Sequence, residues 1–324
     1  MRLAIISDYN IAGQSTYLMR AINKYTDHKA RCIIANDDGF QYDKDIILNT
    51  KEEKEEAAEW CKKADFFHFG RLIFNWPGID FNKLLNPRNC CIKYYGSELR
   101  AGYKVIGQFH EKTGIAAITG TDWSITGQLQ NSFYHLGSYF TKFGDMEEEN
   151  IPLCEYGEKL KICASSAGSP LKGYDILFEV VHQLIQDKIP IQLDFIEQVS
   201  NKICLERKQD YNCTFSSLHG GWGISGVESM YLGHLVVGCL DPWVLSLYPD
   251  NPAFIVDKDS LKQVLKGLAV NCGMLGPLYG ERARKFAIRN FSTKTILKRY
   301  LYLFDLIMNN RDYLKGGKAP DKIY

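Results

Sequence analysis

Short apolar segments alternate with amphipathic segments along almost the whole chain, and this alternation constrains the fold more than any other feature. Residues 3–6 are continuously apolar, and in the helix expected next, Leu18, Ala21 and Ile22 share one face. Further short strands are expected at 31–35, 65–69, 90–95 and 115–119, with a charged helix at 51–63. Buried strands that alternate with helices are typical of a parallel sheet covered on both faces.

The same alternation restarts in the second half of the chain. An acidic, irregular segment at 145–158 is interpreted as the interdomain linker. Beyond it, strands are expected at 160–165, 191–196, 213–216, 235–239 and 254–256. Because open parallel sheets bind ligands at the carboxyl ends of their strands, two such sheets predict a ligand site in a central cleft between them. The expected division is 1–150 for the N-terminal domain, 151–285 for the C-terminal domain and 286–324 for a final helix that packs back on the N-terminal domain and carries a basic tail.

The near-neutral net charge results from a cancellation. The 324 residues include 39 Lys plus Arg and 38 Asp plus Glu, a formal charge of +1. Residues 281–324 alone carry about +7, however, and residues 1–280 about −6. A docked helix with a solvated basic face explains the basic segment most simply, and contact with a polyanion or an anionic membrane is the alternative.

Cysteine usage and hydropathy favour a reduced cytoplasmic protein, with the surface of a membrane as the alternative location. The ten cysteines form no Cys-x-x-Cys pair, which argues against a zinc ribbon. The first residues become polar too early for a signal peptide, and no stretch approaches the roughly 20 apolar residues that a membrane helix needs.

The strongest local motif is the glycine-rich run G-G-W-G-I-S-G-V-E at 220–228. Gly223 and Gly226 let the backbone approach a ligand closely, and free amides near Ser225 at a helix N-terminus favour an anion. Glu228 is placed to accept hydrogen bonds from hydroxyls of a sugar or ribose. A glycine-rich loop that merely closes a strand–helix unit is the alternative.

This motif resembles that of the family-4-like retaining glycosyltransferases of the GT-B fold, in which E-G-F-G-x-x-x-x-E precedes A-M-A-x-G-x-P-V-V. Here the second part stands as S-M-Y-L-G-H-L-V-V. The resemblance implies that Glu228 binds the ribose hydroxyls of the nucleotide. The chain departs from the pattern at Gly220, where the family has a Glu that contacts the donor sugar, and at Leu235, where a Pro is common.

A second stretch, K-G-Y-D-I-L from Lys172 onward, is similar to the family's loop after the first strand of the C-terminal domain. The resemblance implies that Lys172 neutralises the donor diphosphate and stabilises it as it leaves. An Arg usually accompanies this lysine, but Ser166 and Ser169 stand in the stretch where it is expected.

The N-terminal half contains weaker matches. Gly13 matches the family's glycine loop at the donor phosphates, and Y-G-S-E-L-R resembles H-G-S-D-L-R, which places Glu98 at the acceptor edge. A capping turn with an ion pair to Arg100 is the alternative for Glu98. Residues 120–122 follow a strand and line the expected cleft. His68 ends a buried strand, where it is either a polar catalytic group or a core histidine.

Other enzyme classes fit poorly. Residues 43–45 and 257–259 spell D-x-D, but neither follows a long apolar strand, so both read as solvated turns and no metal site is predicted. A dehydrogenase needs Gly-x-Gly-x-x-Gly after the first strand, where only one glycine occurs. No Gly-x-Ser-x-Gly elbow and no carboxylate pair with glycosidase spacing is present.

The expected protein is therefore an α/β, GT-B enzyme with two Rossmann-like domains. The predicted reaction moves a hexose or pentose from a nucleotide sugar, a UDP- or GDP-sugar, to a hydroxyl of a carbohydrate, a lipid-linked glycan or DNA. It proceeds with retention, without metal or further cofactor. The predicted catalytic residues are Lys172, His68 and Glu98, and the predicted donor-binding residues are Gly13, Lys172, Gly223, Ser225, Gly226 and Glu228. The alternatives are a GT-B-fold binding or scaffolding protein without transferase activity, and a transferase acting on a polyanion such as modified DNA.

Overall fold

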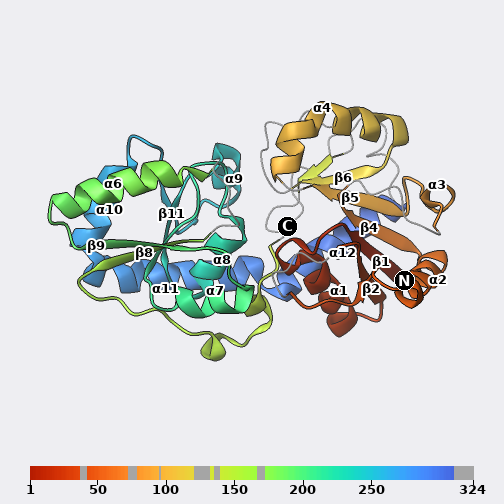
Figure 1. Ribbon diagram of the computed structural model, residues 1–324, viewed down its shortest axis with the longest axis horizontal. Helices are drawn as coiled ribbons and strands as arrows, with labels where there is room; N and C mark the ends of the chain where they lie inside the picture. The colour runs from red at the N-terminus through yellow and green to blue at the C-terminus, as the bar shows by residue number, and fades with distance from the viewer. Residues whose placement is uncertain are drawn as a thin grey trace. The chain divides into compact units, whose positions relative to one another are not determined.

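The computed structural model describes residues 1–36, 42–71, 79–94, 96–119, 132–134, 139–165 and 172–309. The chain divides into two compact units. The N-terminal unit contains Met1–Phe140 and Thr293–Tyr324, and the C-terminal unit contains Thr141–Ser292. Each unit has its own parallel sheet flanked by helices (Figure 1).

The sheet of the N-terminal unit has the strand order β3-β2-β1-β4-β5-β6-β7, and its strand pairs are parallel. Its central strand β1 is buried at every position except the first, as expected for a strand covered on both faces. The strands are β1 Arg2–Ser7, β2 Lys29–Ile34, β3 Ile46–Ile47, β4 Phe66–Gly70, β5 Cys90–Tyr94, β6 Ala116–Thr119 and β7 Ser132–Tyr134.

The helices of this unit are α1 Gln14–Tyr25, α2 Lys51–Lys62, α3 Phe81–Leu84, α4 Gly96–Thr113 and α12 Thr293–Asn309. A capping box begins α2, because the Thr50 hydroxyl accepts from the Glu53 amide and the Glu53 carboxylate accepts from the Thr50 amide. The last helix, α12, buries Ile296, Tyr300 and Phe304 and contacts α1 and β4. The apolar residues of α12 recur every three to four positions in the sequence and form one face of the helix. This face thus packs against the N-terminal unit.

The sheet of the C-terminal unit has the order β12-β11-β10-β8-β9 and is also parallel. The strands are β8 Leu160–Ser165, β9 Ile191–Ile196, β10 Cys213–Phe215, β11 Leu235–Gly238 and β12 Phe254–Ile255. The helices are α6 Tyr174–Gln186, α7 Asn201–Lys208, α8 Gly223–Tyr231, α9 Pro242–Leu247, α10 Leu261–Val270 and α11 Cys272–Phe291. The main core lies between the sheet and helices α6 and α10, around residues such as Ile162, Val181 and Leu265.

The acidic segment 145–158 is packed against the C-terminal unit rather than extended in solvent. The Cys154 amide donates to the Leu232 carbonyl at 2.9 Å, and the Arg284 guanidinium donates to the Ile151 carbonyl at 3.0 Å. Two short 3-10 turns, Lys142–Asp145 and Glu148–Asn150, shape the segment. Its backbone hydrogen bonds therefore belong to the second unit.

The strands expected from the apolar runs are present, with their ends shifted by a residue or two. Two strands were not expected, β3 and β7, and both lie at sheet edges. With two and three residues they are too short to give an alternating or continuous apolar pattern. The prediction of a doubly wound parallel sheet thus depends on the longer central strands, whose apolar runs are recognisable in the sequence.

Candidate functional site

The strand order of the C-terminal sheet reverses direction between β8 and β10, which are neighbours although β9 separates them in sequence. Ligands of open α/β sheets bind at such a reversal, beyond the carboxyl ends of the strands. Here the two strands end at Ser165 and Phe215, and the chain leaves them through Lys172 and through the glycine-rich loop that leads into α8. The two sequence motifs therefore meet at one edge of one sheet.

The glycines of the loop fall into two kinds. A side chain built at Gly221 or Gly223 would meet no atom within 4 Å, so the backbone there faces open space. Gly223 has a φ of +59° and begins α8. A side chain built at Gly226 would instead come within 3.1 Å of the Trp222 side chain, so this glycine allows close packing inside the fold. The open backbone at the start of α8 is a cradle of the kind that admits a phosphate.

Glu228 is buried in the second turn of α8 and forms an ion pair. Its Oε2 lies 2.8 Å from the Nζ atom of Lys208, and the two side chains are 6% and 0% exposed. Its Oε1 accepts from the Asn201 side-chain amide at 3.2 Å. Burial lowers the pKa of Lys208, but the Glu228 carboxylate, with smaller contributions from Cys204 and Cys163, offsets burial and leaves that pKa above its usual value. Both Lys208 and Asn201 were missed by the sequence reading, because neither belongs to a motif.

Ser225 connects α8 to the end of β8 and to the end of α7 by hydrogen bonds. Its hydroxyl lies 2.5 Å from the hydroxyl of Ser165 at the end of β8 and accepts from Lys208 at 3.0 Å. Its carbonyl accepts from the same ammonium at 3.2 Å. The first turn of α8, the end of β8 and the end of α7 are thus held together by one serine and one lysine.

Lys172 stands directly before Gly173, which has a φ of +75° and precedes the first residue of α6. The Lys172 carbonyl accepts from the Leu218 amide at 3.0 Å, which joins the loops that follow β8 and β10. Burial lowers the pKa of Lys172, and the positive charge of Lys208 lowers it further. Two cationic groups within electrostatic reach of each other make this edge of the sheet attractive to an anion.

Gly13 lies in the N-terminal unit, directly before α1, with a φ of +71°. A side chain at this position would come within 2.8 Å of the rings of Tyr17 and Tyr42. Glycine is therefore required here by backbone conformation and by close packing inside the unit.

His68 occupies the middle of β4 and is 2% exposed. Its ring lies 5.6 Å from that of Tyr300 and 6.2 Å from that of Phe304, both on α12. Burial, with a smaller effect of Lys93, lowers the pKa of His68 to about 3, so the ring is neutral at physiological pH. This position matches the core histidine considered above as the alternative to a catalytic group.

Several predicted positions lie outside the described residues. Glu98 and Arg100 fall within α4, but their side chains are not described. Residues 120–122 and the serines at 166 and 169 are also outside the described part of the chain.

The two D-x-D sequences make local structural contacts. Asp45 pairs with Arg31 at 2.7 Å, and Asp43 with Arg20 at 2.6 Å. Asp257 accepts from the Ser260 amide at 2.8 Å just before α10, as in a capping turn. Among the described residues, no group of three or more His, Cys, Asp or Glu side chains is placed to hold a metal ion.

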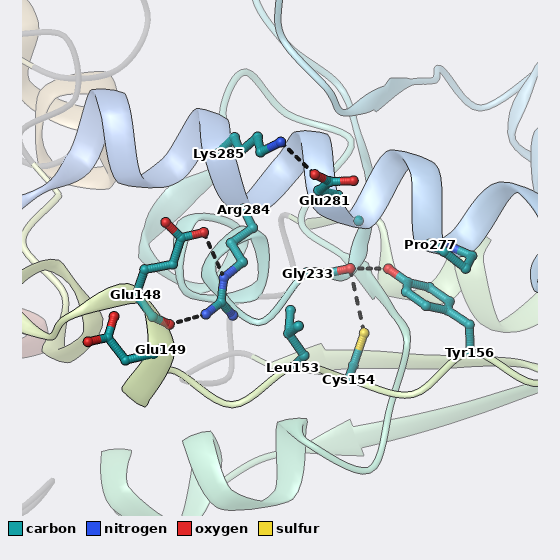
Figure 2. Close-up of a pocket in the computed structure, with 11 residues that line it drawn as sticks. Glu148, Glu149, Leu153, Cys154, Tyr156, Gly233, Pro277, Glu281, Arg284 and Lys285 are labelled. Carbon is teal, nitrogen blue, oxygen red and sulfur yellow. Dashed lines mark hydrogen bonds and ion pairs between the residues drawn. The ribbon is translucent and has the colours of Figure 1, made fainter.

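A separate cavity of about 680 Å³ opens near the amino end of β11, away from the α8 cradle (Figure 2). It is lined by Glu148, Glu149, Leu153, Cys154, Tyr156, Gly233, Pro277, Gly280, Glu281, Arg284 and Lys285. Figure 2 shows Arg284 reaching from α11 to the chain at Glu148, where it donates to that residue's carbonyl, and Tyr156 pointing at the Gly233 carbonyl. The guanidinium is thus used to hold the acidic segment, and the other cation in the lining, Lys285, pairs with Glu281.

No protein-family profile matches the sequence. A search of curated proteins likewise returns no significant relative. Solved structures do match over nearly the whole chain, and they place the fold among the GT-B glycosyltransferases. The predicted fold class is therefore confirmed.

Three of these structures illustrate the likeness. HepE from Anabaena, solved with UDP and glucose, has a TM-score of 0.61 at 10% identity, covering 94% of this chain and 99% of that one. Sucrose-phosphate synthase from Thermosynechococcus elongatus gives 0.63 at 12% identity, covering 95% and 99%. An alpha-glucosyltransferase in complex with UDP and a 13-mer DNA containing an HMU base gives 0.58 at 12% identity, also covering 95% and 99%. At these identities the likeness establishes the fold alone.

Proposed function

We propose that this protein is a glycosyltransferase that moves a sugar from a nucleotide sugar to a hydroxyl acceptor. One observation carries the proposal. At the strand-order reversal of the C-terminal sheet, Lys172, the open backbone of Gly221 and Gly223 at the start of α8, and the buried Glu228 come together. A cation, a helix N-terminus and a fixed carboxylate are the groups that bind a nucleoside diphosphate.

In this proposal each group acts at a different part of the donor. The Lys172 ammonium and the amides at the start of α8, around Gly223 and Ser225, bind the diphosphate. They also stabilise the negative charge that grows on it as the glycosidic bond breaks. The Gly226 amide instead donates to the Trp222 carbonyl at 3.1 Å, and this glycine serves the close packing of the loop. The Glu228 carboxylate accepts hydrogen bonds from the ribose hydroxyls. Because burial and Lys208 lower the pKa of Lys172, a diphosphate beside it relieves an unfavourable environment.

We further propose retention of the anomeric configuration and neutralisation of the diphosphate by protein cations instead of a metal. The resemblance to family-4-like enzymes supports the first, and the nearness of Lys172 and Lys208 supports the second. Gly13 on the donor side and Glu98 at the acceptor remain parts of the proposal that come from the resemblance. His68, enclosed by Tyr300 and Phe304, is proposed to support the fold of the N-terminal unit and not to touch substrate.

The acceptor is proposed to be a hydroxyl compound and not a polyanion, because most cations of α11 already have partners; the basic tail at 310–324 lies outside the described residues. Arg284 is buried and bound to backbone carbonyls. Lys285 pairs with Glu281, and Arg289 pairs with Asp250. Much of the positive charge in α11 is thus already compensated within the unit. No helix among the described residues combines the length and apolarity needed to cross a bilayer.

Incubation with UDP-, GDP- and ADP-sugars, with release of the nucleoside diphosphate as the readout, tests the proposal. UDP-sugars come first, because the HepE and alpha-glucosyltransferase structures contain UDP. Lys172→Ala is expected to lower turnover about 10²- to 10³-fold, the usual loss for one group that stabilises developing charge. Lys161→Ala, which removes an exposed lysine on β8, is the matched control and should leave turnover unchanged. If no donor binds or turns over, the enzyme proposal is wrong and the scaffolding alternative gains.

A further inference from the structure

Helix α7 touches Glu228 from both of its ends. Asn201 is its first residue and Lys208 its last, and both side chains bond the same carboxylate, at 3.2 and 2.8 Å. Residues seven apart lie on one face of a helix, two turns from each other. Helix α7 lies beside α8 (Figure 1), and two polar side chains of α7 reach the same carboxylate of α8.

Lys208 has no freedom left in this arrangement. Its side chain is fully buried, and its ammonium donates to Glu228 Oε2, to the Ser225 hydroxyl and to the Ser225 carbonyl. An ammonium has three donors, so all three are used. Because all three of its donors bond α8, Lys208 cannot also donate to a ligand. It can affect the site only by orienting Glu228 and by its positive charge.

Glu228 is correspondingly fixed. One of its oxygens faces Lys208 and the other faces Asn201, and the side chain is only 6% exposed. A carboxylate oxygen has two lone pairs, so Oε1 retains capacity for one more donor while its direction is set by Asn201. The carboxylate is thus preorganised, and rotation is blocked by two partners on a neighbouring helix.

We propose that Lys208 and Asn201 are positioning residues that hold Glu228 in the orientation needed to accept the ribose hydroxyls of the donor. Lys208 also places its positive charge beneath the first turn of α8, within electrostatic reach of Lys172. This inference rests on the proposed function, because it assumes a nucleotide at this site.

Without Lys208 the buried carboxylate lacks a counter-charge, so it turns away or loses its charge, and its hydrogen bonds to hydroxyls weaken. The base and the phosphates are bound by other residues in this proposal, so the loss of Lys208 leaves their contacts in place. Recognition of the ribose hydroxyls should therefore suffer more than nucleotide binding as a whole.

Isothermal titration of the full chain with UDP and with 2′,3′-dideoxy-UDP measures this directly. The wild type should prefer UDP by about 10- to 100-fold, the usual worth of hydrogen bonds to a charged group. Lys208→Met should lower that preference about tenfold. Asn201→Ala, which keeps the ion pair, should lower it about threefold, and Lys208→Arg should restore part of it. Lys202→Met, on the same helix but exposed, is the matched control and should keep the preference. General destabilisation would weaken both ligands alike and leave the ratio unchanged.

The outcomes separate the two proposals. An unchanged preference in Lys208→Met and Asn201→Ala, or a wild type that binds both ligands equally, overturns the positioning role while leaving the transferase proposal in place. If Lys208→Met does not fold, Asn201→Ala decides by the same ratio. If the wild type binds none of UDP, GDP and ADP, the proposed function fails, and the positioning role fails with it.

Discussion

Both units bury a lysine, but the two lysines sit in opposite environments. Lys93, the fourth residue of β5, donates to the Tyr300 hydroxyl at 3.0 Å, and Lys208 donates to the Glu228 carboxylate at 2.8 Å. Burial lowers the pKa of Lys93 to about 7. At Lys208 burial is offset by the Glu228 carboxylate together with Cys204 and Cys163, and the pKa rises. The same residue type is thus half-neutral near physiological pH in one unit and firmly charged in the other.

The difference shows which unit is organised around charge. In the C-terminal unit a buried ion pair, an open helix N-terminus and Lys172 surround the strand-order reversal. In the N-terminal unit the corresponding reversal lies between β1 and β4, where the Ser7 hydroxyl donates to the Gly70 carbonyl at 3.2 Å. The C-terminal reversal thus has a buried ion pair and an open helix N-terminus beside it, whereas at the N-terminal reversal the ends of β1 and β4 are joined by a neutral hydrogen bond.

The largest effect is expected from breaking the buried ion pair. Lys208→Met should lower the free energy of unfolding of the C-terminal unit by about 3–5 kcal/mol, because the Glu228 carboxylate stays buried without its counter-charge. Urea denaturation followed by hydrogen exchange in peptides from α7 and α8 measures the loss.

The double variant Lys208→Met with Glu228→Gln is the control for this loss. It removes both charges, so most of the stability should return. Since the folded pKa of Lys208 is raised, the contribution of the pair is complete below the unfolded lysine value and disappears as pH rises through the folded value. A double variant as unstable as the single one would contradict this account.

A smaller effect of opposite sign is expected at Lys93. Its folded pKa of about 7 lies below the unfolded value of 10.5, so the unfolded chain binds more protons between these values and stability rises with pH. Between pH 7 and 8.5 this rise should reach about 1.6 kcal/mol, because the slope grows from about half to nearly all of roughly 1.4 kcal/mol per pH unit. Lys93→Met should be more stable than the wild type at pH 7 and should lack the rise.

The pH window matters for this measurement. Burial raises the pKa of Cys32, Cys61 and Cys90 to about 12, so above about pH 9 these thiols lower stability as pH rises. Unfolding of the N-terminal unit, followed by hydrogen exchange in β4 and β5, should therefore be compared below pH 8.5. Parallel wild-type and Lys93→Met profiles in that range would refute the assignment.

The sequence predicted the parts of the site that depend on local chemistry. Gly223, Ser225, Gly226 and Glu228 follow one another on a loop and helix whose start and end are marked by glycines, and Lys172 follows a strand end. Lys208 could not be predicted this way, because its role depends on how α7 packs against α8, and a lysine at the end of a charged helix ordinarily lies in solvent.

The dependence on tertiary packing also explains why the sequence left the roles of two other residues open. His68 and Arg284 are polar residues that a sequence leaves open to catalysis or to nucleic-acid contact. Tertiary packing instead buries His68 of β4 against α12, and it directs Arg284 to backbone carbonyls. Burial of a polar side chain is decided by partners far along the chain, so no local pattern reports it.

The smallest effects should come from two glycines, one in each unit. Gly13→Ala meets a φ of +71° and two tyrosine rings, so it should lower the free energy of unfolding by about 1–2 kcal/mol. Gly221→Ala meets open space, so stability should stay within about 0.5 kcal/mol of the wild type. Its methyl group would instead stand in the cradle and weaken UDP binding about tenfold. Chemical denaturation and UDP titration of both variants measure the contrast. If Gly221→Ala binds UDP as tightly as the wild type, the open backbone at the start of α8 is not where the diphosphate lies.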